Sequence, residues 1–442
     1  MQKLNSELLK KFENQYDSDI KNNLIEGAIS NVGVVEASKN KRVINKHNFL
    51  FNEEIDHKNI TNQNQSGRCW MFAALNMARP KIMKDLNLDD FELSESYLYF
   101  YDNMEKTNVF LDKIIKTKDL DINSREVIDA LKFKTDDGGY FEYFKILIDK
   151  YGIVPKNVMG ESFNTDNARE MFLRIEEVTK KYAMDIRNEN SYEEIDKLRE
   201  ECLSKVYNIL VKCIGKPVEK FDFEYQDKDK NYHIEKNMTP MSFYKKYLDG
   251  FYDNKIRLIN DPRERNPYAR VFINPEIKNL VELEGLRGLN VPTEEMKNAM
   301  VKSLKDGNTA WFACDVGKMS DRKSGILDLD LYNYDDTLVP VGEFSKADRI
   351  DSRQSMATHA MNITGVKILN DKPEMWKVEN SWGEKNGKKG IFSMSDAWFD
   401  SYVYELIIEK DYVDEKYLKG LDEEAIEYSP YDAFCTAFGK VR

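Results

Sequence analysis

A cysteine stands where a polar loop meets an apolar helical run, in the stretch NQNQSGRCWMFAAL at residues 62–75. A free thiol has a pKa near ~8.5, so only a few per cent of it is thiolate at neutral pH. The first turn of a helix presents unpaired N–H groups and about half a positive charge, which favour the anion. A helix beginning at Cys69 therefore predicts a reactive sulfur, with a buried structural cysteine as the alternative.

A glutamine precedes this cysteine by six residues, on a loop that can fold back beside the sulfur. We expect the side-chain N–H₂ of Gln63 and the backbone N–H of Cys69 to form a two-donor oxyanion site. Such donors act on charge that develops only in the transition state, and each contributes roughly 3 kcal/mol. Taken alone, a glutamine before a cysteine is weak evidence.

A thiol nucleophile also needs a base, and the chain has four histidines: His47, His57, His233 and His359. The first two lie in charged, loop-like stretches before the nucleophile, and His233 lies in the charged stretch DKDKNYHIEK, typical of a solvated surface. In contrast, His359 enters the apolar run MNITGV. We therefore predict that His359 is the base, with a satisfied core histidine as the alternative.

An asparagine follows this histidine by 21 residues, in the stretch VENSWG at 378–383. A strand, a turn and a return strand of that length would bring Asn380 next to His359. We expect the amide oxygen of Asn380 to accept the Nδ1–H of His359, so that Nε2 faces the sulfur. Trp382 is then expected to cover this hydrogen bond and exclude water.

The elements that must position these groups differ along the chain. Residues 1–60 predict a helix followed by short strands, such as 31–35. The helix from Cys69 is expected to end or kink near Pro80, because proline lacks an N–H and clashes with the preceding turn. Ser94 is a predicted N-cap. A tight loop at 136–139 precedes a helix over 140–151 that closes with Gly152.

The pattern changes twice after residue 165. Long charged helical segments cover 167–186 and 193–213, and the second carries an apolar stripe with Cys202 and Cys213, predicted core residues. A strand over 221–225 and a helix from Thr239 follow. Strands then predominate, with Cys314 predicted in a strand core; they are expected at 309–316, 360–369, 374–379 and 402–408. The predicted class is α+β, with helices first and an antiparallel sheet later.

We predict three regions from these patterns. Residues 1–164 form an N-terminal arm and a helical lobe with the nucleophile, 165–300 a mainly helical insertion, and 301–442 a β-rich lobe with the histidine, the asparagine and a C-terminal tail. The length of 442 residues and the hydrophobic share of 41% allow a large core for such an arrangement.

Composition narrows the classes of function. The net charge is −12, which gives no global attraction to nucleic acid or to an anionic membrane. Neither a signal peptide nor a run of eighteen apolar residues is found. Five scattered cysteines do not resemble a disulfide framework or a zinc site. We therefore expect a cytoplasmic protein that needs no metal or organic cofactor.

In order and type, these residues resemble the papain-type cysteine peptidases. The matches are Gln63, Cys69-Trp70, Leu93-Ser94-Glu95, the glycine pair Gly138-Gly139, His359, Asn380-Ser381-Trp382-Gly383 and Gly390-Ile391-Phe392. Arg68 departs from that signature, which has Ser or Ala there. The resemblance implies the two-lobe papain-like fold, an acyl-enzyme at Cys69, and substrate backbone binding at the glycine pair.

Within that family the chain is most similar to bleomycin hydrolase and the bacterial aminopeptidase C. The additional matches are Cys314-Asp315-Val316-Gly317-Lys318, Gly325-Ile326-Leu327-Asp328 and Thr358-His359-Ala360-Met361. This resemblance implies a cytosolic, ring-shaped homohexamer that removes N-terminal residues from peptides. It also implies that the carboxylate of the last residue, Arg442, receives the α-amine of the substrate.

The end of the chain leaves other functions open. Pro430-Tyr431-Asp432 resembles the subfamily's Pro-Trp-Asp, but 433–438 departs from it and 439–442 extends it with a basic end. If this tail does not restrict the cleft, a papain-like endopeptidase results. A nucleic-acid-binding or scaffold hexamer is a second alternative, which the negative charge opposes. A transglutaminase-like enzyme is a third, which Asn380 opposes because those enzymes generally use an aspartate there.

Overall fold

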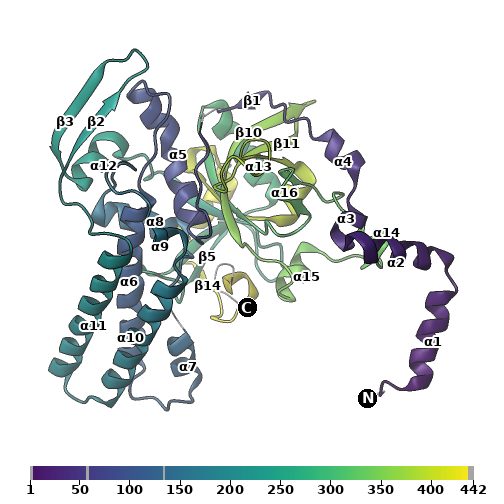
Figure 1. Ribbon diagram of the computed structural model, residues 1–442, viewed down its shortest axis with the longest axis horizontal. Helices are drawn as coiled ribbons and strands as arrows, with labels where there is room; N and C mark the ends of the chain where they lie inside the picture. Colours follow the sequence, from purple (N-terminus) through teal and green to yellow (C-terminus); the bar gives the residue numbers. More distant parts are fainter. Residues whose placement is uncertain (1–2, 56–58, 133–134, 437–442) are drawn as a thin grey trace.

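The computed structural model describes residues 3–55, 59–132 and 135–436, and it has the predicted α+β class. Among these residues, twelve strands form one mixed sheet at the centre of the body (Figure 1). Most neighbours are antiparallel, but the pairs β9–β12, β5–β14 and β4–β6 are parallel. The strands are β1 (Glu53–Glu54), β4 (Lys255–Ile259), β5 (Arg270–Asn274), β6 (Leu286–Asn290), β7 (Ala310–Cys314), β8 (Ser320–Asp321), β9 (Ile326–Leu327), β10 (His359–Leu369), β11 (Lys372–Glu379), β12 (Ile391–Ser395), β13 (Val403–Glu409) and β14 (Ile426–Glu427).

The helices fall into three groups along the chain (Figure 1). An N-terminal arm carries α1 (Ser6–Asp17), α2 (Ile20–Val32), α3 (Val34–Ser38) and α4 (Lys41–Lys46). The helical side carries α5 (Cys69–Asp85), α6 (Glu95–Lys116), α7 (Arg125–Lys132), α8 (Phe141–Tyr151), α9 (Phe163–Asp166), α10 (Arg169–Asn188), α11 (Tyr192–Cys213) and α12 (Pro240–Leu248), with the hairpin β2 (Phe221–Gln226) and β3 (Tyr232–Met238). Around the sheet lie α13 (Thr293–Lys305), α14 (Tyr334–Thr337), α15 (Lys346–Asp351), α16 (Asp396–Tyr402), α17 (Glu415–Leu418) and the short 3₁₀ turns η1 (Lys410–Tyr412), η2 (Lys419–Asp422) and η3 (Ala433–Thr436).

The N-terminal arm corrects the prediction of short strands at 31–35. Those residues end α2 and begin α3, and Gly33 separates the two helices with a φ of +81°. A positive φ of this kind suits glycine, and it interrupts the extended backbone that a strand over 31–35 would need. No residue of α1 or α2 is buried, and α1 projects away from the body (Figure 1).

The helix that begins at Cys69 passes through Pro80 and ends at Asp85, so it does not end near Pro80, and the kink predicted there as the alternative stays a prediction. An internal proline costs a helix about 3 kcal/mol or more. Packing on both sides offsets this cost: Ala78 and Ile82 are fully buried, and the buried Arg79 donates to the carbonyl of Phe91 at 2.7 Å.

Helix ends elsewhere follow the local sequence signals. The Ser94 hydroxyl accepts from the backbone N–H of Tyr97 at the start of α6, and Gly152 closes α8 with a φ of +74°. Thr239 caps α12 through a capping box with Ser242. These three predictions are confirmed.

The two long charged helices pack against α6, and together they form the elongated part of the helical side (Figure 1). Cys202 is buried there as predicted, whereas Cys213 lies partly buried at the edge of the core. Cys314 is fully buried in β7, also as predicted. The three-region division at 164 and 300 stays a prediction.

Candidate active site

The sulfur of Cys69 lies at the N-terminal end of α5. The helix begins at Cys69 as predicted, and no side chain caps it, so the backbone N–H groups of Cys69 and Trp70 remain available to the sulfur. Cys69 is 5% exposed. Arg68, which precedes it, is fully buried and donates to the Ser66 hydroxyl at 3.0 Å and to the Glu161 carboxylate at 2.8 Å. These bonds of the buried Arg68 side chain fix the loop before the nucleophile to Glu161.

The first turns of α5 lie against the start of β10. The indole N–H of Trp311 donates to the Trp70 carbonyl at 3.1 Å, and the Asn362 amide donates to the Ala73 carbonyl at 2.9 Å. The backbone N–H of Ala360 faces the sulfur of Cys69. Since Ala360 directly follows His359, the structure brings the predicted nucleophile and the predicted base to the same place, 290 residues apart in the sequence.

The imidazole of His359 is held by Asn380, but through the other nitrogen than predicted. Its Nε2 lies 2.8 Å from the Asn380 Oδ1, so Nδ1 is the nitrogen that remains for the sulfur. The predicted assignment was reversed because sequence spacing places two residues together without fixing how a ring is turned. The ring of Trp382 stacks on that of His359 with centroids 4.6 Å apart and an angle of 28°, and so covers the hydrogen bond.

Burial disfavours the thiolate form of Cys69 and the imidazolium form of His359 when either is charged alone. It raises the pKa of Cys69 to about 11; the N–H groups of Ala360, Trp70 and Cys69 lower it and the Asp137 carboxylate adds to the rise. Burial also lowers the pKa of His359 to about 4, against the hydrogen bond to Asn380, which raises it. Transfer of the proton from sulfur to imidazole forms both charges together, and their mutual attraction then offsets the burial.

The predicted oxyanion donor, Gln63, lies buried in the loop before α5. Its backbone N–H donates to the Ser381 carbonyl at 2.8 Å, and its Oε1 accepts from the Ser381 hydroxyl at 2.5 Å. Its Nε2 donates to the Ser66 carbonyl at 2.6 Å, which uses one of its two N–H bonds. Ser381 is named in the motif of the sequence analysis but given no role there, because its partner Gln63 is 318 residues away and leaves no local signal.

The predicted glycine pair lies beside this helix start. A Cβ at Gly139 would lie 2.4 Å from the Trp70 ring, so only glycine fits. The Trp70 indole N–H donates to the Asp137 carbonyl at 2.7 Å, and Lys106 donates to the Gly138 carbonyl at 2.5 Å. Asp137, another residue given no role by the sequence analysis, also accepts from the backbone N–H of Gly67 at 2.8 Å and thereby joins the two loops.

A groove of about 440 Å³ runs along the outer side of these two loops. It is lined by Gln65, by the loop at 135–137 and by the start of α10, with Phe172 and Glu176 among its residues.

The remaining predicted positions lie elsewhere or outside the described residues. Arg442 and His57 belong to the segments that the structure does not describe. His47, predicted in loop-like surroundings, is buried and bonds the Ser393 hydroxyl at 2.8 Å and the Asp328 carboxylate at 3.1 Å. His233 lies on β3, 40% exposed and bonded to Asp227.

No helix of the described residues is long and apolar enough to cross a membrane, and no group of three or more of their His, Cys, Asp or Glu side chains is placed to hold a metal.

A thiol at a helix start, an imidazole on a facing strand and an orienting asparagine define a cysteine peptidase site on an α+β fold. The family model for the Peptidase C1-like family matches residues 3–435, and the chain belongs to that family.

Its relatives cover nearly the whole chain. Aminopeptidase C of Lactobacillus delbrueckii subsp. lactis is 40% identical over 407 residues, covering 90% of this chain and 91% of the relative. Aminopeptidase C of Listeria monocytogenes is 36% identical over 430 residues, covering 97% and 98%. The crystal structure of PepW from Lactobacillus rhamnosis matches with a TM-score of 0.95 at 37% identity, covering 98% of both chains. This match confirms the predicted fold class.

Proposed function

We propose that the protein is a cysteine aminopeptidase that hydrolyses N-terminal residues from peptides. The observation that carries the proposal is the bond between His359 and Asn380, at the start of the strand whose Ala360 N–H lowers the pKa of the Cys69 thiol. His359 takes the thiol proton as sulfur attacks the peptide carbonyl, and a tetrahedral oxyanion forms. The C–N bond then breaks, His359 protonates the leaving amine, and the acyl group stays on Cys69. His359 next activates the water that hydrolyses this thioester.

The neighbouring groups take supporting roles. The backbone N–H of Cys69 and the second side-chain N–H of Gln63 stabilise the oxyanion. The backbone of Gly138 and Gly139 binds the extended substrate, and the stacked Trp382 keeps water from the hydrogen bond between His359 and Asn380.

Restriction to free N-termini comes from the chain's own tail. The 3₁₀ turn η3 brings Ala433 and Phe434 against Met356 and Ala357, just ahead of His359. We propose that the residues after this turn continue into the cleft and that the carboxylate of Arg442 binds the α-amine of the substrate. Were the tail to leave the site open, the enzyme would act as an endopeptidase.

The test compares a free-amine peptide with its N-acetylated twin, using the wild-type protein and Cys69→Ala. We expect hydrolysis of the free peptide at least tenfold faster than of the twin, no turnover by Cys69→Ala, inactivation by a thiol alkylator and no effect of a chelator. Equal rates on the two peptides would refute the aminopeptidase, and activity in Cys69→Ala would refute the cysteine mechanism.

Assembly as a cytoplasmic homohexamer is part of the proposal. The arm supports it: Leu9, Ile20 and Leu24 are 50% to 78% exposed on helices that have no buried residue. Apolar faces of this kind are covered by partners more often than by water. Sedimentation of the full chain should give six protomers, and removal of residues 1–32 should give smaller species; a full-length monomer would contradict the assembly.

A further inference from the structure

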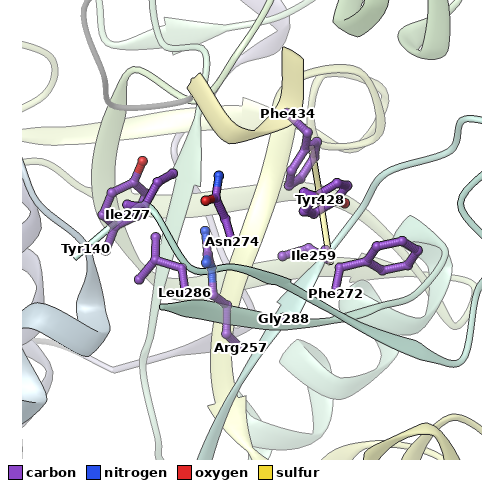
Figure 2. Close-up of a pocket in the computed structure, with 10 residues that line it drawn as sticks. All are labelled: Tyr140, Arg257, Ile259, Phe272, Asn274, Ile277, Leu286, Gly288, Tyr428 and Phe434. Carbon is purple, nitrogen blue, oxygen red and sulfur yellow. The ribbon is translucent and has the colours of Figure 1, made fainter. Parts of the chain in front are cut away.

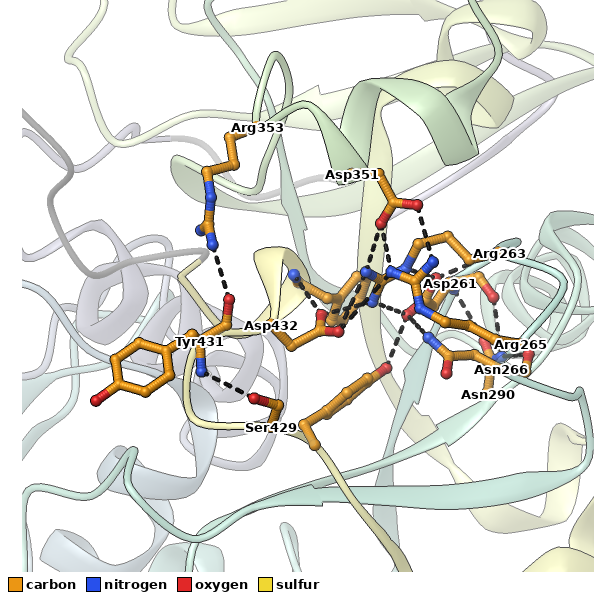
Figure 3. Close-up of polar contacts among 12 residues, drawn as sticks. Asp261, Arg263, Arg265, Asn266, Asn290, Asp351, Arg353, Ser429, Tyr431 and Asp432 are labelled. Carbon is orange, nitrogen blue, oxygen red and sulfur yellow. Dashed lines mark hydrogen bonds and ion pairs between the residues drawn. The ribbon is translucent and has the colours of Figure 1, made fainter.

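A cluster of ion pairs fastens the C-terminal segment to the body, and we name it the C-terminal clamp: Asp261, Arg263, Asp351 and Asp432. Arg263 is 2% exposed. Its guanidinium donates to Asp261 at 2.7 Å, to Asp432 at 2.6 Å and to Asp351 at 2.9 Å (Figure 3). Three carboxylates on one buried guanidinium fix their segments tightly, because releasing one leaves part of a buried charge unpaired.

A second set of contacts holds the residue before Asp432. Arg353 donates to the backbone carbonyl of Tyr431 at 2.7 Å (Figure 3). The Tyr431 hydroxyl donates to Asp129 on α7 at 2.6 Å, and the Arg125 guanidinium lies 3.3 Å from the centre of its ring. The segment is thus attached to the helical side as well as to the sheet.

Phe434, two residues further, fills the space next to the clamp. It stacks on Tyr428 with centroids 5.9 Å apart (Figure 2). It also meets Tyr404 edge-on, with centroids 6.3 Å apart. Cavities of only about 20 and 10 Å³ remain around it, room for one water molecule at most. The described chain therefore reaches Phe434 in a closely packed position.

The same cluster holds the loop that leads to His359. Asp351 ends α15, and Ser355, four residues on, accepts from the Tyr404 hydroxyl at 2.7 Å and donates to Asp315 at 2.8 Å. Ala357 lines the small cavity beside Phe434. One set of side chains thus fixes both the departure point of the tail and the approach to the base.

We propose that the C-terminal clamp is a positioning site for the tail, and that Arg263 sets the preference for free N-termini by fixing where the tail leaves the body. This inference rests on the proposed function. Arg263 and Asp432 act through the tail and touch no substrate, so their loss changes which peptides are cleaved more than whether cleavage occurs.

The experiment measures the ratio of kcat/KM for a free-amine peptide to that for its N-acetylated twin. Asp432→Asn weakens the clamp from the segment's side without emptying the site of Arg263, and we expect the ratio to fall at least tenfold. Arg353→Ala removes the bond to the Tyr431 carbonyl from an exposed position and is expected to lower the ratio two- to fivefold. Asp432→Glu should restore at least half of the wild-type ratio.

The matched control is Arg265→Gln, which removes an exposed ion pair with Asp351 and leaves the bonds of Arg263 in place. Its ratio should equal that of the wild type. A chain ending at Phe434, which lacks the tail, gives the ratio expected with no restriction.

The outcomes separate the two proposals. If the wild type does not discriminate between the peptides, the proposed function fails. If the wild type discriminates and the chain ending at Phe434 does not, while Asp432→Asn and Arg353→Ala both keep the wild-type ratio, the clamp proposal fails alone. An equal loss of both activities at a constant ratio also overturns it, because that is the effect of a merely structural role.

Discussion

The catalytic centre and the C-terminal clamp are both buried, yet they are held by opposite means. At the centre, neutral groups meet through one hydrogen bond of 2.8 Å and one ring stack on His359. In the clamp, Arg263 meets three carboxylates, and its pKa is raised by them despite its burial. The centre holds a thiol and an imidazole that pass a proton between them, whereas the clamp holds charged groups in ion pairs. Burial therefore serves reactivity in one place and fixed geometry in the other.

The largest expected effect tests the centre directly. Cys69→Ala should lower turnover of an aminoacyl amide by about 10⁵-fold or more, because no other group replaces the nucleophile. Circular dichroism should show an unchanged fold. Cys202→Ala, a buried cysteine on α11, is the control and should keep activity within about threefold. An equal loss in both variants would mean that the thiol of Cys69 has no special role.

Substitutions in the C-terminal clamp should lower the free energy of unfolding, whereas substitutions in the catalytic centre should lower the rate of turnover. Asp261→Ala leaves part of the charge of Arg263 unpaired and removes the acceptor of the Tyr428 hydroxyl, so the free energy of unfolding should fall by about 3 kcal/mol. Chemical denaturation measures it. Arg265→Gln, in an exposed pair of the same cluster, should cost less than about 1 kcal/mol. Equal costs would remove the distinction between the buried and the exposed part of the clamp.

Asn380→Ala should have the reverse effect of Asp261→Ala: it should lower the rate of turnover more than the free energy of unfolding. Turnover should fall about 10²-fold, because the ring of His359 loses the acceptor that orients it. The pKa of His359 should fall further, since the bond to Asn380 opposes the effect of burial. Steady-state kinetics and an NMR titration of the ring measure the two effects. A stability loss as large as that of Asp261→Ala, with unchanged kcat, would contradict the comparison.

A charged network directly beneath the centre sharpens the comparison by its pH dependence. Burial alone raises the pKa of Glu161, but Arg68 and Lys156 together lower it to about 2. Because the folded pKa lies below the unfolded value, this stabilisation is present above pH ~4.5 and is lost as pH falls toward 2. Glu161→Gln should therefore cost about 2–3 kcal/mol at pH 7. Its stability should converge with that of the wild type in acid-unfolding curves; a pH-independent difference would refute the assignment.

Local sequence signals were enough to predict several helix boundaries and the order of the site residues along the chain. The loop before Cys69 predicts a helix start, Ser94 an N-cap and Gly152 a helix end, because each acts within a few residues. The passage of α5 through Pro80 was not predictable, since tertiary packing outweighs the local cost.

Contacts between distant segments leave no such signal. The bond from Ser381 to Gln63 joins residues 318 apart, and that from Arg263 to Asp432 residues 169 apart. Both depend on the assembled fold. The ring nitrogen that faces Asn380 likewise depends on how the His359 side chain is turned in the assembled fold, which spacing along the chain does not describe.

The contacts between the loop at 62–63 and the turn at 381–382 limit how the site can open. The backbone of Asn62 bridges to Trp382, and Gln63 bonds Ser381 through both its backbone and its side chain. These contacts join the two segments at this end of the site, and separating the segments there would break all of them. A motion that opens the site for a bulky substrate therefore has to rotate the segments about these contacts and separate them at the opposite end of the site.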